Sequence, residues 1–292
     1  MSEGPKLRLA LPKGSLQDTT IEVFRRAGYS IRVTSRSYYP SIDDPDIECI
    51  LIRPQEMARY IEQGVMDCGI TGLDWVLESG ADVQELADLK APLPNYGSVR
   101  WILAVKDHSP FQSPKDLDGK RIATEVMGLT KRYLADQGFT AQLEFSWGAT
   151  EVKPPILADA IVDVTETGSS LRANQLRVID TLLESTPRFV ANHAACEDPW
   201  KRAKMDRMLM LMRGAIAATT RVGLSMNVPR ERLDAVLKLL PPGAPTLSPL
   251  ADEAWVDVFV IIDEVRVREI VPSLHEAGAR VLVETALSKI ID

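Results

Sequence analysis

The stretch of the sequence best suited to chemistry is residues 158–171, ADAIVDVTETGSSL. Its apolar first half predicts a strand that ends at Thr165, and a helical pattern follows the turn 166–170. The first N–H groups of a helix are unpaired and lie at the positive end of its dipole, so such a turn can bind phosphate. Gly168 would let the phosphate approach the backbone closely. The hydroxyl donors beside it are Thr167, Ser169 and Ser170.

Two acidic residues, Asp163 and Glu166, stand next to this turn. Beside a phosphate they would be repulsive unless they contact another group, and ribose hydroxyls or a bound cation are natural partners. The combination predicts a pocket for a ribose 5-phosphate. The alternative is a capped helix start without a ligand, because Ser and Thr are common N-cap residues.

The bulk composition is that of an ordinary globular protein, with 292 residues of which 45% are hydrophobic and 26% charged. This length predicts about two or three domains. A net charge of −7 argues against general nucleic-acid binding, because that affinity comes mainly from neutralised phosphates. An anion site must therefore be local.

The chain start, MSEGPKLRLA, lacks the apolar core of a signal peptide, and no run approaches the length of a membrane span. The three cysteines, Cys49, Cys68 and Cys196, are too scattered for a disulfide framework or a clustered metal site. We therefore expect a reduced, cytoplasmic protein with no membrane association.

The elements that must position the turn form an α/β pattern. Over the first 95 residues, strands are predicted at 7–11, 47–52 and 66–71, and helices at 16–26 and from Pro54 onward. This alternation predicts a mostly parallel sheet covered on both faces.

A second unit follows, with predicted strands at 99–105, 121–124, 139–147, 161–165 and 177–183. Its helices are predicted at 128–138 and 156–160, the latter running into the strand that precedes the turn. Two α/β lobes of this size predict a cleft between them, where small ligands commonly bind.

After a long helix at 200–218 the pattern changes near Gly214 to that of a smaller domain. It contains strands at 223–228, 255–262 and 280–286, helices at 231–240 and 267–277, and a proline-rich segment at 241–249. This order is typical of a ferredoxin-like unit.

The chain as a whole resembles the ATP phosphoribosyltransferases of histidine biosynthesis, the HisG family, in their long form. Residues 159–171 resemble the family's phosphoribosyl-pyrophosphate (PRPP) loop. Further similar segments, in the same order, are residues 9–16 (LALPKGSL), 52–54 (IRP), 64–72 (GVMDCGITG), 119–124 (GKRIAT) and 233–241. Each segment alone is weak, but their joint order is highly specific.

The resemblance implies a two-lobed core like that of periplasmic binding proteins. Catalytic lobe I would comprise residues 1–95 plus about 185–213, and lobe II residues 96–184. Residues 214–292 would form a ferredoxin-like, ACT-like regulatory domain. It also implies transfer of the phosphoribosyl group of PRPP to N1 of ATP with release of pyrophosphate, the first step of histidine biosynthesis. Feedback inhibition by histidine and a homo-oligomer, dimer or hexamer, are further expectations.

The resemblance carries site residues over to this sequence. The PRPP-binding residues would be Asp163, Glu166, Thr167, Gly168, Ser169, Ser170 and Leu171. The residues for ATP and pyrophosphate would be Lys13, Gly14, Arg36, Arg53, Asp67, Gly69 and Arg100, with Arg36 and Arg53 catalytic. Mg²⁺ would be held chiefly by the pyrophosphate oxygens, so no protein ligand is assigned.

The sequence departs from the family pattern in places. Ser170 stands where Thr is usual, which keeps the hydroxyl, and residues 151–157 are one residue short, which puts the geometry entering the loop in doubt. Leu73 stands where a charged residue is common, so it is given no role.

Other functions remain open at this stage. Two α/β lobes around a cleft also describe solute-binding proteins, against which the hydroxyl-rich turn and the missing signal peptide argue. A catalytically inactive regulatory paralogue is another alternative, opposed by the intact turn and Lys13. The C-terminal domain could serve oligomerisation alone. The isolated histidines, His108, His193 and His275, are expected to be structural or on the surface.

Overall fold

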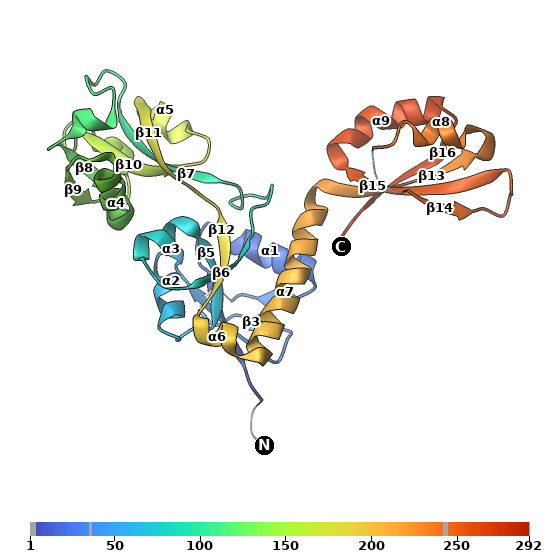
Figure 1. The fold of residues 1–292 in the computed structure, drawn as a ribbon, viewed down its shortest axis with the longest axis horizontal. Coiled ribbons are helices and arrows are strands. Elements are labelled where there is room, and N and C mark those ends of the chain that lie inside the picture. The colour runs from blue at the N-terminus through green and yellow to red at the C-terminus, as the bar shows by residue number, and fades with distance from the viewer. Residues whose placement is uncertain (1–3, 35–36, 242–244, 292) are drawn as a thin grey trace. The chain divides into compact units, whose positions relative to one another are not determined.

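The computed structural model describes residues 4–34, 37–241 and 245–291. These residues fall into two compact units. The first comprises the chain up to Glu22 together with Tyr29–Asp206, and the second comprises Val23–Gly28 together with the chain from Arg207 onward. Figure 1 shows both units and labels many of their elements.

One sheet of the first unit, with the helices packed on it, is called lobe I. Among the described residues it has five strands in the order β4 (Ile47–Ile52), β1 (Leu7–Pro12), β5 (Cys68–Gly72), β12 (Pro187–Ala191) and β6 (Gln84–Asp88). Its helices are the first part of α1 (Gln17–Ala27), α2 (Pro54–Glu62), α3 (Leu73–Ser79), α6 (His193–Glu197) and the start of α7 (Pro199–Ala217). A short ladder joins β2 (Ile31–Arg32) and β3 (Ser41–Ile42).

Helix α2 illustrates why lobe I folds as it does. Pro54 occupies its first turn, where a missing N–H costs nothing. Ile61 follows Met57 and Ala58 by four and three residues, so the three side chains share one helix face, which is buried against the sheet. Helices α1, α2 and α3 follow the carboxyl ends of β1, β4 and β5. Because these strands are parallel neighbours, the turns between strand and helix lie side by side.

The second sheet of this unit, with its helices, is called lobe II. In the described part of the chain its five strands lie in the order β11 (Leu176–Ser185), β7 (Val99–Lys106), β10 (Ala160–Thr165), β8 (Arg121–Thr124) and β9 (Gln142–Phe145). Its helices are α4 (Met127–Gln137) and α5 (Ser169–Ala173), with 3-10 turns η1 (Pro114–Leu117) and η2 (Thr150–Val152). Trp101, Leu103, Ile122 and Val162 are core residues.

The parallel pairing predicted for the first 95 residues holds for β1, β4 and β5, but the complete sheet is mixed. Each of the two sheets has two parallel and two antiparallel pairings among its described strands. The reason is that the chain passes between the lobes twice, and β7 and β12, which follow these crossings, run against β10 and β5 respectively.

The sequence predicted β4, β8 and β16 (Arg280–Ala286) with their observed bounds, and most other elements within a few residues. The helix predicted at 156–160 is absent from the described chain. Asp159 already pairs with β8 through its N–H and its carboxylate, so only a turn fits before β10. The helix predicted at 231–240 is shorter, comprising η4 (Arg230–Arg232) and α8 (Leu233–Leu237).

The second unit contains a four-stranded antiparallel sheet over its described residues. The strand order is β14 (Thr246–Pro249), β15 (Trp255–Asp263), β13 (Arg221–Pro229) and β16. Helices α8 and α9 (Glu264–Glu276) follow β13 and β15, which gives the ferredoxin-like order β-α-β-β-α-β.

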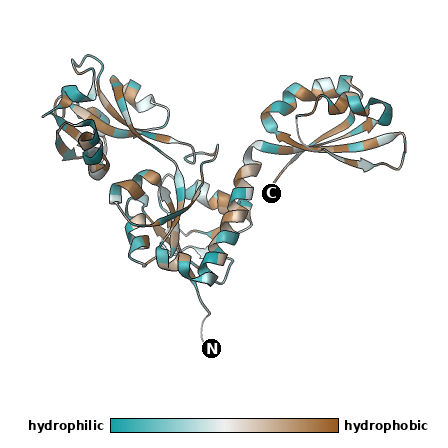
Figure 2. Ribbon diagram, viewed as in Figure 1, coloured by the Kyte–Doolittle hydropathy of each residue, from teal (hydrophilic) through white to brown (hydrophobic). Residues whose placement is uncertain are grey.

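Buried and more exposed residues alternate along β13 and β15, as expected for strands with one buried face. The hydrophobic residues of these strands are brown in Figure 2. Leu224, Met226 and Val258 on that face pack with Val267 and Leu274 of α9. The predicted fold class, an α/β two-lobed core followed by a ferredoxin-like α+β domain, is thus confirmed.

Candidate functional site

A cavity of about 700 Å³ lies in the first unit, at the carboxyl ends of β1, β4 and β5. Such ends are where open α/β sheets bind ligands. The lobe I turns contribute Lys13–Asp18, Arg53–Gln55, Gly72, Asp74 and Trp75. The segments through which the chain passes between the lobes, with the strand ends beside them, contribute Asn95, Gly97, Val99 and Ser185–Pro187. Lobe II contributes Trp101, Glu125 and Val164.

Two cations stand at this cavity, Lys13 after β1 and Arg53 after β4. The Lys13 Nζ lies 3.7 Å from the ring centroid of Tyr38. Lys13, with a smaller contribution from Arg53, lowers the pKa of Tyr38, which indicates that the three side chains share one electrostatic environment. Within the described chain no carboxylate forms an ion pair with Lys13 or Arg53, so both charges remain available to an anion.

A buried carboxylate, Asp74, lies at the floor of the cavity and was not predicted from the sequence. The Trp101 indole Nε1 donates a hydrogen bond to it at 2.7 Å, and the Trp75 backbone N–H donates at 3.0 Å. Burial raises the pKa of Asp74 despite these donors. A Cβ at Gly72 would lie only 2.0 Å from the Asp74 Oδ1, so glycine is needed there.

Asp74 also connects the two lobes. Its backbone N–H donates to the Ser185 Oγ at 3.0 Å, on the second crossing, while its side chain binds Trp101 of β7. The Trp75 and Trp101 rings meet edge to face with centroids 5.9 Å apart. The available sequence signal was an acid in the first turn of a helix directly after a glycine, but its partners are too distant in sequence to be inferred.

The predicted phosphate turn has the expected backbone form. Gly168 adopts φ +72° and precedes α5, and its N–H donates to the Thr165 Oγ1 at 2.9 Å. The side chains of Thr167, Ser169 and Ser170 are exposed. The predicted residue Leu171 differs, because its side chain is buried in the lobe II core.

Arg172 adds a positive charge to this turn and was missed by the sequence reasoning. Its Nη1 donates to the Thr167 carbonyl at 3.1 Å and lies 3.2 Å from where a Gly168 Cβ would be. The guanidinium therefore covers one side of the turn. The signal that could have found it is a basic residue one helical turn after Ser169.

Asp163 is half-buried on β10, two residues before the strand ends. Burial, together with the negative charges of Glu151 and Glu125, raises its pKa to about 6. Among the described residues, its carboxylate accepts a hydrogen bond only from the Val164 backbone N–H, at 2.8 Å. No cation balances it within the described residues, so its ionised form is held at a free-energy cost.

The structure brings only some of the predicted residues together. Lys13, Gly14 and Arg53 line the cavity, but the 166–171 turn does not. The turn reaches the cavity's edge through Glu166, because a Cβ on Gly97 would lie 3.7 Å from the Glu166 Oε1. Arg100 is exposed on β7 opposite Thr165, outside the lining. Arg36 lies outside the described residues.

Asp67 and Gly69, also predicted to line the cleft, are placed elsewhere. Asp67 precedes β5, at the opposite end of this strand from the cavity, and is buried. Gly69 is buried within β5, where a Cβ would lie 2.8 Å from both the Ala10 Cβ and the Met57 Sδ. The glycine therefore serves close packing, and neither residue is available to the cavity.

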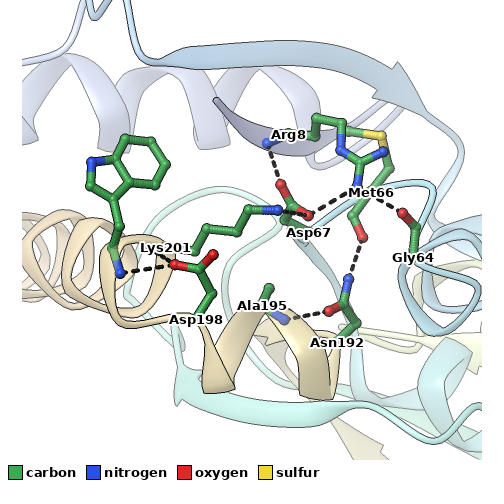
Figure 3. Close-up of polar contacts among 9 residues, drawn as sticks. Arg8, Gly64, Met66, Asp67, Asn192, Ala195, Asp198 and Lys201 are labelled. Carbon is green, nitrogen blue, oxygen red and sulfur yellow. Dashed lines mark hydrogen bonds and ion pairs between the residues drawn. The ribbon is translucent and has the colours of Figure 1, made fainter. Parts of the chain in front are cut away.

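Figure 3 shows what Asp67 does instead. Its carboxylate accepts hydrogen bonds from the Arg8 backbone N–H at 2.8 Å and Nη2 at 3.1 Å, and from the Lys201 Nζ at 2.8 Å. Nearby, Asn192 caps α6 by accepting from the Ala195 N–H at 2.7 Å and donates to the Met66 carbonyl. These contacts fix the start of α7 to the amino end of β5.

Among the residues that the structure describes, no group of three or more His, Cys, Asp or Glu is placed to hold a metal ion. None of the helices formed by those residues is long and apolar enough to cross a membrane.

Comparisons with known proteins agree along nearly the whole chain. Residues 53–214 match the family described as HisG, ATP phosphoribosyltransferase, and residues 218–289 match the HisG C-terminal domain. Two proteins named ATP phosphoribosyltransferase, from Chlorobaculum parvum and Chlorobium chlorochromatii, are 56% and 55% identical to this chain. These matches cover 98% of this chain and 98% of the first relative, and 100% of this chain and 99% of the second.

A solved structure is also similar, the ATP phosphoribosyl transferase (HisG:HisZ) complex from Thermotoga maritima. The match has a TM-score of 0.61 and 27% identity, and it covers 71% of this chain and 98% of that chain.

Proposed function

Because the chain belongs to the ATP phosphoribosyltransferase family and is an enzyme of histidine biosynthesis, we propose that it transfers the phosphoribosyl group of PRPP to N1 of ATP and releases pyrophosphate. One observation carries this proposal. The cavity has two uncompensated cations on lobe I, Lys13 and Arg53, and its edge on lobe II meets the exposed hydroxyl turn 166–170.

The reaction joins two polyanions, so charge neutralisation is its first requirement. Lys13 and Arg53 would bind the pyrophosphate and ATP phosphates on lobe I. The hydroxyls and amides after Glu166, with Arg172 beside them, would bind the 5-phosphate of PRPP on lobe II. The two substrates would then meet over the cavity.

The chemical step needs no nucleophilic side chain. N1 of the adenine attacks C1 of the ribose while the bond to pyrophosphate breaks, so positive charge develops on the ribose and negative charge on the leaving group. Asp163 and Glu166 are suited to ribose hydroxyls, and Arg53 to the departing pyrophosphate. Catalysis would then come from positioning and electrostatic stabilisation.

Mg²⁺ would accompany the pyrophosphate oxygens, since this ion often uses substrate phosphates and water as ligands. Glu125 and Glu151 act electrostatically on Asp163, so this region is already rich in negative charge. Such surroundings suit a metal-bound pyrophosphate better than a bare one.

We further propose that the C-terminal unit binds histidine and that the protein is a homo-oligomer. The relative from Thermotoga maritima is described as an assembly, a HisG:HisZ complex. Inhibition would require histidine to bind two states of this protein with different affinity. A truncated chain that ends near Gly214 should then lose histidine inhibition. If the C-terminal unit serves oligomerisation alone, the truncated chain should still be inhibited by histidine.

The direct test is release of pyrophosphate on mixing ATP, PRPP and Mg²⁺, with and without histidine. Gly168→Asp should reduce turnover by more than about a hundredfold, because it places a side chain and a negative charge where phosphate would bind. Gly138→Asp is the matched control, since Gly138 has a similar φ of +77° and open space around it.

A folded Gly168→Asp variant with normal kinetics would refute the phosphate turn. Arg53→Ala should lower kcat/KM by more than about tenfold, or about 1.4 kcal/mol. Ligand binding without any pyrophosphate release by the unmodified chain would favour a solute-binding protein instead.

A further inference from the structure

A direct contact joins the two lobes beside the cavity, between the end of α3 and the start of α4. Both helices lie in the first unit, and Figure 1 shows α3 and α4 on the facing sides of lobe I and lobe II. The Glu78 carboxylate of α3 accepts hydrogen bonds from the Gly128 N–H at 2.9 Å and the Leu129 N–H at 2.7 Å.

Helix α4 depends on this contact to complete its first turn. Val126 stands at its N-cap position and has no side chain that could accept a hydrogen bond, and its first turn contains no acid. The capping carboxylate is therefore supplied by the other lobe. A negative charge at this position also interacts favourably with the helix dipole.

Two more features show that the helices are fitted to each other. Arg132 of α4 donates through Nη2 to the Leu77 carbonyl near the end of α3, so the contact runs in both directions. A Cβ at Gly128 would lie 2.9 Å from the Glu78 carbonyl oxygen and 3.2 Å from its Oε2. Only glycine allows this approach without displacement of backbone.

The contact is placed where it can set the width of the cavity. The first turn of α3 contains the cavity residues Asp74 and Trp75, and Glu125 of the cavity lies just before α4. The start of α3 is tied to the second crossing by the bond to Ser185. The helix thus spans from the crossing to the Glu78 contact.

We propose that Glu78 is a positioning residue that holds lobe II against α3 and keeps the two walls of the cavity at the separation that the reaction needs. This inference rests on the proposed function, in which each lobe carries part of the substrates. When the contact breaks, the lobes separate and a smaller fraction of molecules can bind both substrates productively. The apparent affinity for the substrates then falls in proportion to the fraction of molecules whose lobes are close enough to bind both.

The test combines a distance measurement with kinetics. Spin labels at Gln63→Cys in lobe I and Gln137→Cys in lobe II, in a Cys196→Ser background, report the separation of the lobes. Glu78→Ala should shift the distances to longer values and lower kcat/KM about tenfold, mainly through KM. Glu78→Gln keeps one acceptor and should lie between Glu78→Ala and the unmodified protein.

Gly128→Ala provides an independent variant, because it keeps the Glu78 carboxylate but forces the helices apart. It should reproduce the longer distances. Asp136→Asn, an exposed change further along α4, is the matched control and should leave both measurements unchanged. Circular dichroism at the assay temperature identifies variants that fail to fold.

Each result decides the matter. Unchanged distances in both Glu78→Ala and Gly128→Ala would overturn the proposal whatever the kinetics, and longer distances with unchanged KM would overturn the positioning role. If the unmodified protein makes no product, the proposed function fails, while the distance measurement still tests the contact between the lobes.

Discussion

Asp67 and Asp163 are both aspartates withdrawn from water in the first unit, but their surroundings have opposite charge. Burial opposes ionisation of Asp67, yet hydrogen bonds from Arg8 and Lys201 outweigh it and lower its pKa. Asp163 has no such partner in the described chain, and its negatively charged neighbours help to raise its pKa to about 6.

This difference is the one expected between a structural carboxylate and a carboxylate that contacts a ligand, as proposed for Asp163. The Asp67 carboxylate is satisfied inside the protein, at the amino end of β5, and needs nothing from solution. Asp163 lies near the carboxyl end of β10, just before the phosphate turn, and its ionised form costs free energy until a ligand contacts it. Perturbed carboxyls of this second kind are typical of functional sites.

The largest effect is expected when the satisfied carboxylate is removed. Asp67→Ala would leave Lys201 and the Arg8 amide without their acceptor, and we expect a loss of about 3 kcal/mol in the free energy of unfolding. Urea denaturation measures this loss. Asp67→Asn, which keeps an acceptor, should lose less.

Catalysis should respond differently to the same change. Because Asp67 lies at the far end of β5 from the cavity, folded Asp67→Asn protein should keep KM and kcat within about twofold. A tenfold fall in kcat at a temperature where the variant is fully folded would contradict the structural role and restore Asp67 to the site.

The second prediction is that replacing Asp163 should stabilise the protein, whereas replacing Asp67 should destabilise it. Asp163→Asn removes a charge that the fold does not balance, so at pH 8 the free energy of unfolding should rise by about 1 kcal/mol. Turnover should nevertheless fall by at least about tenfold, because the proposed ribose contact is lost. Glu144→Gln, an exposed change on β9 of the same lobe, is the control for both measurements.

A variant that is both less stable and less active would show that Asp163 is a structural residue like Asp67. One with unchanged activity would remove it from the proposed PRPP site. The opposite movement of stability and activity is therefore the result that distinguishes the two aspartates.

The sequence predicted both Asp163 and Asp67 as site residues, but the structure places Asp67 at the far end of β5 from the cavity, and strand direction explains why. Asp67 stands just before a short apolar strand and Asp163 within another, and the local sequence does not show which aspartate has a partner. Asp67 precedes its strand, while the phosphate turn follows β10, so only the second lies at the carboxyl end of its strand. The partner that marks Asp67 as structural, Lys201, is 134 residues away in sequence.

Other failures have the same cause. The local sequence was enough to predict β4 and β8, because their own side chains and flanking turn residues are typical of strands. The pairing of Asp74 with Trp101 and the contact of Glu78 with α4 arise only when two lobes approach. Strand β6, QELAD, was missed because its residues are mostly polar and its place in the sheet comes from pairing with β12.

The smallest expected effect is a pH dependence that isolates Asp163. Its pKa is raised on folding, so its contribution to stability is fully present below the unfolded pKa of about 3.9 and is lost as pH rises through about 6. The difference in unfolding free energy between the unmodified protein and Asp163→Asn should therefore change by about 1 kcal/mol between pH 5 and pH 7. Asp67, whose pKa is lowered, should contribute a change only as pH falls below about 4.

Removing a neighbouring charge sharpens this last measurement. Glu151→Gln takes away one of the negative charges that raise the pKa of Asp163, so the midpoint of the pH-dependent change should move below 6. A difference curve that is flat from pH 5 to pH 7 would mean that Asp163 ionises freely in the folded protein. The distinction between the two aspartates would then reduce to their number of hydrogen bonds, and the unbalanced charge beside the phosphate turn could no longer be taken as a sign of the ligand that completes it.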